Sequence, residues 1–220
     1  MRNTLVSTLL CISLATGCTT VFAAEQTISP TLLQRIRALL GLVPPVAAGG
    51  SRGDSKAVNV CLISPLVTQP GDVAVVPIPR PTILTAQPLN EVRIEQNGQV
   101  LWQKLASSTQ PVAGRIPWPV EPVQPGEELI LVLRPRGSSG GDVARIRLQG
   151  ASVEVMTYTQ SLLNDLHTNP WSWEAKITKT LNDKNHALAV ALLNEKSSLP
   201  PAQMKQLQNL VATFSCQAKP

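Results

Sequence analysis

The chain has 220 residues, a formal net charge of +5, four cysteines and two histidines. Aromatic residues make up only 3 % of the chain and the basic residues form no dense run, so the composition argues against a nucleic-acid-binding protein. The two histidines lie far apart and no cysteine pair has metal-ligand spacing, so the sequence predicts neither a metal site nor a cofactor.

The first 23 residues predict export. Arg2 gives a positively charged start, and residues 4–17 form an uncharged, largely apolar run of about 14 residues. A membrane-spanning helix needs about 20 such residues, so residues 1–23 are interpreted as a signal peptide that is cleaved after Ala23. Cleavage removes Arg2 and no acidic residue, which lowers the net charge from +5 to +4.

A second cleavage site competes with the first. The segment Leu14–Cys18 resembles a bacterial lipobox, in which the cysteine is acylated and becomes the first residue of the mature protein. Acyl chains on Cys18 would anchor the protein to a membrane, whereas cleavage after Ala23 would release it. The predicted location is therefore periplasmic or secreted, with a membrane-anchored lipoprotein as the alternative.

The remaining cysteines predict one disulfide. Cys11 lies in the signal peptide and Cys18 is either removed or acylated, so the mature chain keeps Cys61 and Cys216. A lone pair of cysteines in an oxidising compartment usually forms a bridge. Two buried free thiols are the alternative.

Residues 24–56 predict an amphipathic helix followed by a Gly-rich linker. Ser29 suits the N-cap position, Pro30 the first helical position and Gly41 the C-terminal stop, so the helix is expected over Ser29–Leu42. One face is apolar and carries residues at helical spacing: Leu32, Leu33, Ile36, Leu39 and Leu40.

The linker contains two short motifs without the context that their functions need. Gly49–Gly53 fits the Gly-x-Ser-x-Gly pattern, but a nucleophile elbow follows a strand and precedes a helix, and here that order is reversed. The tripeptide Arg52–Asp54 matches an integrin-binding sequence by chance. The available bases, His167 and His186, lie in the helical tail outside any catalytic motif. The sequence therefore predicts no catalytic residues and a protein that is not an enzyme.

Residues 57–150 have the pattern of an all-β domain. Strands are expected at Val58–Ile63, Val73–Ile78, Glu128–Leu133 and Val143–Gln149. The clearest hairpin joins residues 91–96 to residues 99–103 through Asn97-Gly98, the pair that a type I′ turn favours.

A two-residue loop in that hairpin places Ile94 opposite Leu101, and Arg93 opposite Trp102 as a cation–π pair. Twelve prolines fall between Pro65 and Pro135, which indicates short strands with proline-rich connections. We therefore expect a mainly β protein with an immunoglobulin-like β-sandwich, an N-terminal helix and a C-terminal helical segment.

Residues 151–220 change to helical periodicity. One helix is expected over Val153–Leu166, with continuation of the preceding strand through residues 153–155 as the alternative. This helix is broken at Asn169-Pro170, and one or two more follow around Ile177–Leu193. A last helix is expected after Pro200-Pro201.

The chain resembles a family of uncharacterised exported proteins common in cyanobacteria. The likeness lies in the exported start, Gly49–Gly53 with Cys61 after it, the turn Pro125–Glu127 before an apolar strand, and the short helical tail. The resemblance implies a β-sandwich-like region followed by helices, and it assigns no activity and no functional residue.

One charged cluster stands out from this background. Two strands expected to be adjacent end in four arginines: Arg134, Arg136, Arg145 and Arg147. Paired strands would gather their guanidinium groups into a patch able to bind carboxylate or sulfate groups. The alternative is that the arginines protect a sheet edge and face water.

The predicted function is an exported, non-enzymatic envelope protein that acts as a protein-interaction or assembly module. The alternative is a module that binds anionic polysaccharide through the arginine patch, and a cryptic hydrolase ranks third. The expected partner is an envelope protein or an anionic glycan, with membrane contact only if Cys18 is lipidated.

Overall fold

The computed structural model describes residues 29–41, 46–47, 59–69, 71–138, 141–169 and 172–194, together with residues 206 and 210. The predicted signal peptide, the linker motifs at 49–54, Cys18 and Cys216 lie outside this range, and so does nearly all of the last predicted helix. None of the helices within the described ranges is long and apolar enough to cross a membrane.

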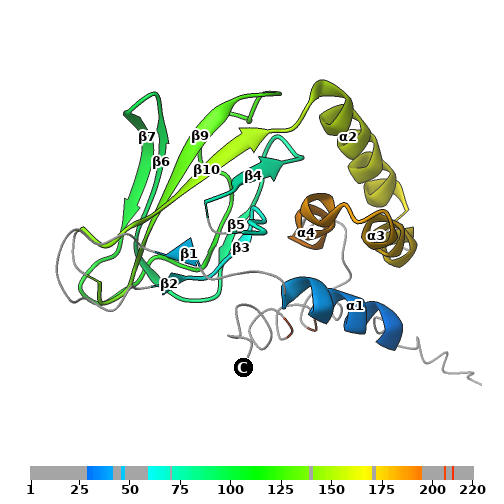
Figure 1. The fold of residues 1–220 in the computed structure, drawn as a ribbon, viewed down its shortest axis with the longest axis horizontal. Coiled ribbons are helices and arrows are strands. Elements are labelled where there is room, and N and C mark those ends of the chain that lie inside the picture. The colour runs from blue at the N-terminus through cyan, green and yellow to red at the C-terminus, as the bar shows by residue number, and fades with distance from the viewer. Residues whose placement is uncertain are drawn as a thin grey trace, which may run out of the picture.

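The described residues form four helices and sheets of five, three and two strands (Figure 1). This mixture confirms the predicted combination of a two-sheet β region with helices on both sides of it in sequence. The helices are α1 (Pro30–Leu40), α2 (Val153–Thr168), α3 (Trp173–Asn182) and α4 (His186–Asn194). The strands are β1 (Val46–Ala47), β2 (Asn59–Val60), β3 (Leu62–Ser64), β4 (Val73–Val76), β5 (Ile83–Thr85), β6 (Leu89–Gln96), β7 (Gln99–Leu105), β8 (Arg115–Ile116), β9 (Glu128–Pro135) and β10 (Ala144–Gly150).

The larger sheet has the strand order β4-β10-β9-β6-β7. All its neighbours run antiparallel except β4 and β10, which are parallel. The expected pairing of the two arginine-bearing strands is confirmed, because β9 and β10 form a regular ladder that sets Arg145 opposite Val132. Strands β4 and β7 are the edges of this sheet.

The smaller sheet, β3-β5-β8, lies between the larger sheet and the helices (Figure 1). Its side chains alternate between two hydrophobic cores, as the period of two in a strand requires. Leu62 and Ile83 join the core shared with the five-stranded sheet, and Ile63 and Leu84 join the core shared with the helices. The fold therefore has three layers: the large sheet, the small sheet and the helices.

Helix α1 begins where the sequence places its N-cap. The Ser29 hydroxyl accepts a hydrogen bond from Leu32 N at 3.2 Å, Pro30 is the first residue of α1, and Gly41 caps its end. Ser152 caps α2 in the same way through Val155 N. Four residues of the predicted apolar stripe are buried in the helical core: Leu32, Ile36, Leu39 and Leu40.

The prediction of a single strand over Val58–Ile63 is wrong. The chain pairs with β1 up to Val60 and with β5 from Leu62 onward, so Cys61 separates two strands of different sheets. The alternation continues across this break, since Cys61 faces the helical core and its neighbours face the sheet core. Cys61 is buried and disulfide-bonded; because the other cysteines lie outside the described residues, the pairing with Cys216 stays a prediction.

The hairpin turn is correct, and its predicted register is wrong. Asn97 and Gly98 have φ values of 50° and 79°, as a type I′ turn requires. An irregularity after Glu95 and Val100 then shifts the ladder by one residue, so Ile94 lies opposite Trp102 and not opposite Leu101. A β-bulge sets two residues against one, and turn chemistry alone does not reveal it. The expected Arg93–Trp102 pair is lost, because Arg93 lies opposite Gln103.

Candidate functional site

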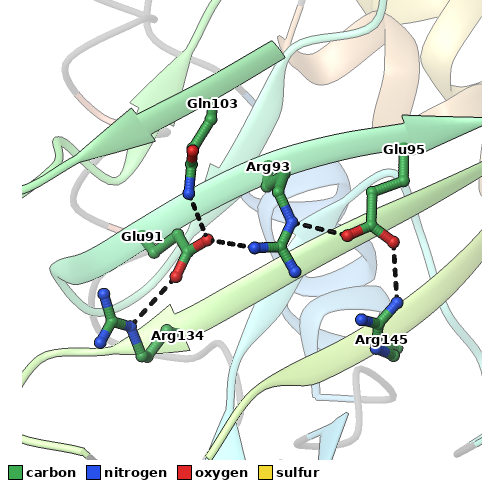
Figure 2. A network of polar contacts seen from close by, with 6 residues as sticks. All are labelled: Glu91, Arg93, Glu95, Gln103, Arg134 and Arg145. Carbon is green, nitrogen blue, oxygen red and sulfur yellow. Dashed lines mark hydrogen bonds and ion pairs between the residues drawn. The ribbon is translucent and has the colours of Figure 1, made fainter. Parts of the chain in front are cut away.

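The outer face of the five-stranded sheet, turned away from the small sheet, carries a connected network of charges (Figure 2). Its centre is a Glu-Arg-Glu row at alternate positions of β6, where the period of two places all three side chains on one face. Arg93 bridges the row, with Nη1 2.7 Å from Glu91 Oε1 and Nε 2.6 Å from Glu95 Oε1.

Neighbouring strands complete this charge network, which we define as Glu91, Arg93, Glu95, Gln103, Arg134 and Arg145. Gln103 of β7 donates to Glu91 Oε1 at 2.7 Å, and Arg134 of β9 lies 3.3 Å from Glu91 Oε2. Arg145 of β10 lies 2.8 Å from Glu95 Oε2. Figure 2 shows that the network crosses the sheet from β7 to β10, so it ties together four strands.

The charge network is partly shielded from solvent. The side chains of Glu91 and Glu95 are 7 % and 13 % exposed. Burial acts to raise the pKa of Glu95, but the hydrogen bonds and positive charges of Arg145 and Arg93 outweigh it and hold that pKa below its usual value. Three guanidinium groups face two carboxylates, so the network keeps a net charge of +1 when all five groups are ionised.

The charge network also covers a hydrophobic residue. Val132 of β9 alternates with Leu131 and Leu133, which face the sheet core, and so it points to the outer face. It is nevertheless fully buried, and its register partners on the two sides are Arg93 and Arg145. The aliphatic parts of such long side chains cover apolar surface while their charged ends meet partners. The charge network therefore keeps solvent away from Val132 on the outer face of the sheet.

The four arginines of the predicted patch do not all lie together on an exposed surface. Arg134 and Arg145 are ion-paired with the glutamates of β6. Arg147 is exposed and donates to Gly71 O at 3.1 Å, and Arg136 is exposed in the turn after β9. The assignment of these four residues to ligand binding stays a prediction.

A second feature of the same sheet is the edge strand β7. Every residue of this strand is exposed except Trp102, and no described strand pairs with it on the side away from β6. Three large apolar residues remain open to solvent: Val100 (53 %), Leu101 (44 %) and Leu105 (57 %). Natural sheets usually protect such edges with charge or proline, and Lys104 is the only charged residue of β7.

The phase of the ladder shows which backbone groups of β7 point outward. Ala106 N donates to Asn90 O at 2.8 Å, so this opposed pair is a hydrogen-bonded pair. Hydrogen-bonded and non-hydrogen-bonded pairs alternate in antiparallel sheets, and therefore the N–H and C=O groups of Gln103 and Leu105 point away from β6. No strand among the described residues pairs with them.

A hollow of about 400 Å³ lies beside this edge. Leu101, Leu129 and Val120 supply apolar lining, and Glu121 and Glu127 lie at the same hollow. Both carboxylate oxygens of Glu127 have hydrogen-bond partners: Oε1 accepts a hydrogen bond from Gln96, and Oε2 accepts one from Gln124 N. Glu121 is exposed, so the hollow combines an apolar lining with a solvent-facing carboxylate.

A half-buried arginine links the helices to the small sheet. Arg115 of β8 donates to Asn194 Oδ1 at 3.0 Å and to Asn194 O at 3.3 Å, at the C-terminus of α4. The helix dipole makes this end a favourable place for a cation. Burial lowers the pKa of Arg115. Sequence analysis did not single out Arg115, because its partner lies 79 residues away.

Comparison with known proteins gave no relative. No family model matches the chain, and no curated protein and no solved structure matches it either. Within the described part of the chain, no three histidine, cysteine or acidic side chains are grouped so that they could hold a metal ion.

Sequence reasoning missed the charge network and the free edge, although both leave a signal. Glu91, Arg93 and Glu95 alternate in sign at the spacing of one strand face. Residues 100–102 are three consecutive apolar residues in β7, and they break the alternation of apolar and polar residues that a strand with one buried face shows.

Proposed function

We propose that this protein is an exported, non-enzymatic interaction module of the cell envelope that binds an extended segment of a partner protein by strand addition at β7. One observation carries the proposal: β7 is a seven-residue edge strand with three exposed large aliphatic side chains and outward-facing backbone groups. Strand addition uses main-chain hydrogen bonds for affinity and side-chain pockets for specificity.

The hollow beside Leu101 supports one class of partner. Its apolar lining accepts an aliphatic or aromatic side chain, and the exposed carboxylate of Glu121 favours a basic neighbour of that side chain. The proposed ligand is therefore an extended segment that places an apolar residue next to a lysine or arginine. Export of the module rests on the predicted signal peptide.

The sheet order supports an immunoglobulin-like assignment as part of the same proposal. The order β10-β9-β6-β7 corresponds to strands G-F-C-C′ of a variable-type immunoglobulin sheet, and β3-β5-β8 corresponds to A-B-E of the opposite sheet. In this assignment β7 is the C′ edge, where one further strand continues the sheet in variable domains.

The test uses a photo-crosslinking amino acid at position 103 of the protein expressed in its native host. We expect crosslinks to one envelope protein, and we expect Leu105→Pro to remove them because proline lacks the outward N–H. A second test variant, Leu105→Lys, places a charge on the edge strand. Its matched control is Val153→Lys, which places the same charge on α2, where Val153 is 59 % exposed.

The result is decisive in either direction. Loss of the crosslink in Leu105→Pro and Leu105→Lys, with retention in Val153→Lys, supports strand addition. Crosslinks that survive Leu105→Pro, or that join two copies of this chain, would overturn it.

The alternative is binding of anionic polysaccharide through Arg134, Arg136, Arg145 and Arg147. It has weaker support, because two of these arginines are neutralised by glutamates. The exposed Arg147 favours it, and the test is the joint change of Arg145 and Arg147 to Ser. That variant should lose salt-sensitive binding to anionic glycans if the alternative holds.

A further inference from the structure

The helical layer contains a groove between α2 and α3 that the function proposed above does not use. It has a volume of about 460 Å³ and is lined by Tyr158, Ser161, Leu162 and Asp165 of α2 and by Lys176, Lys179 and Thr180 of α3. The α2 residues are spaced three, four and seven positions after the tyrosine, so they form one stripe along that helix.

The groove has an apolar floor and polar walls. Leu162 and Thr180 are buried at its base. Asp165 and Lys176 join the walls across the groove by an ion pair of 2.5 Å. Tyr158 is the single tyrosine of the chain, and 53 % of it is exposed. A wide, flat ring in this position leaves an open face beside hydrogen-bonding groups.

A second hollow lies along a neighbouring face of α2. It measures about 610 Å³ and shares Ser161 with the first. Its polar lining is rich in amides, namely Gln124, Gln160 and Asn164, and proline rings supply apolar surface. Helix α2 therefore lines both hollows, and Ser161 belongs to each of them.

We propose that these two hollows beside α2 bind an oligosaccharide, with a carboxylate-bearing sugar seated in the groove between α2 and α3. The Tyr158 ring provides a platform for the apolar face of the sugar, and Lys179 provides a cation for its carboxylate. Ser161, Asp165 and the amides of the second hollow donate to and accept from its hydroxyl groups.

The ion pairs already present in the groove leave Lys179 able to bind a carboxylate of the ligand. Lys179 Nζ lies 2.6 Å from Asp183, and both side chains are more than half exposed. Exposed pairs of this kind contribute little free energy, and an ammonium group has three donors. A ligand carboxylate can therefore share Lys179 at small cost, and Lys176 stays paired with Asp165 at the other end of the groove.

The experiment is isothermal titration of the protein with hexagalacturonate, and with cellohexaose as the neutral counterpart. We expect binding of hexagalacturonate that weakens about tenfold in Lys179→Gln, since a hydrogen bond to a charged group is lost. Tyr158→Ala should lose a similar factor, whereas Tyr158→Phe keeps the platform and should bind nearly as well as the parent protein.

Lys104→Gln is the matched control, because it removes one exposed lysine from β7, on a different layer of the fold. Retained binding in this variant, with loss in Lys179→Gln, supports the site. Three results would overturn it: no binding by the parent protein, equal loss in Lys104→Gln, or equal affinity for cellohexaose. Thermal unfolding of each variant identifies a fold defect, and Tyr158→Phe keeps the test valid if Tyr158→Ala unfolds.

Discussion

The change Arg93→Met tests whether the charge network holds the five-stranded sheet together. Arg93 is 21 % exposed and joins Glu91 and Glu95, whose side chains are 7 % and 13 % exposed. Removing one partner of a fully buried ion pair costs about 3–5 kcal/mol. Each glutamate keeps a second arginine, and Arg93 is not fully buried, so we expect a loss of about 2 kcal/mol in the free energy of unfolding.

The assay is equilibrium urea denaturation at neutral pH, with thermal unfolding as a second measurement. A loss of about 2 kcal/mol corresponds to about 4–8 °C in Tm for a chain of this size. Arg145→Met is the control, because Arg145 is 55 % exposed and forms an ion pair with one glutamate of the network, Glu95. It should cost less than about 1 kcal/mol.

A third variant separates lost pairing from lost side-chain volume. Combining Arg93→Met with Glu91→Gln and Glu95→Gln removes the uncompensated charges and should recover part of the loss. The reasoning is refuted if Arg93→Met costs no more than Arg145→Met, or if the triple variant is less stable than Arg93→Met alone.

Three further changes test other parts of the fold. Because folding lowers the pKa of Glu95, the ionised carboxylate stabilises the fold above the unfolded pKa of about 4.3, and this stabilisation is lost as pH falls through the folded pKa. Between pH 7 and pH 3, urea denaturation should therefore show a smaller decrease in the free energy of unfolding for Glu95→Gln than for the parent protein. An equal decrease in the two proteins would contradict this. Gly150→Ala places a methyl group against Gln124 O and should cost about 1–3 kcal/mol. Gly41→Ala should cost less, because the added methyl group at the end of α1 makes only ordinary van der Waals contacts. Arg115→Leu removes both hydrogen bonds to Asn194 and should cost about 1.5–3 kcal/mol, with faster amide exchange at the end of α4; unchanged exchange there would show that this link does not hold the helix.

Local chemistry made several elements predictable. The caps Ser29 and Ser152 and the turn Asn97-Gly98 satisfy or shape the backbone within three residues, so a single sequence contains the whole signal. The adjacency of β9 and β10 was predictable for the same reason, since a short Gly/Ser-rich turn joins them.

Features that depend on distant pairing were not predictable. The arginine patch was inferred from β9 and β10 alone, but β6 lies beside β9 in the sheet and brings its glutamates within 3.3 Å of Arg134 and 2.8 Å of Arg145. Glu95 is 50 residues from Arg145 in the sequence. The bulge at Leu101 of β7 has the same character, because it depends on how β7 pairs with β6 and lies outside the turn.

The distribution of charge across the layers explains why the proposed binding surfaces lie where they do. On the outer sheet face, guanidinium and carboxylate groups satisfy one another and bury Val132, so an incoming ligand would have to break partly shielded pairs. At β7 the backbone groups of Gln103 and Leu105 have no described partner strand, and in the α2–α3 groove the pair of Lys179 with Asp183 is exposed. A ligand gains new contacts at these two places without disrupting a buried pair. The charge network therefore links four strands of the sheet, and the two proposed binding surfaces lie outside it, at the sheet edge and in the helical layer.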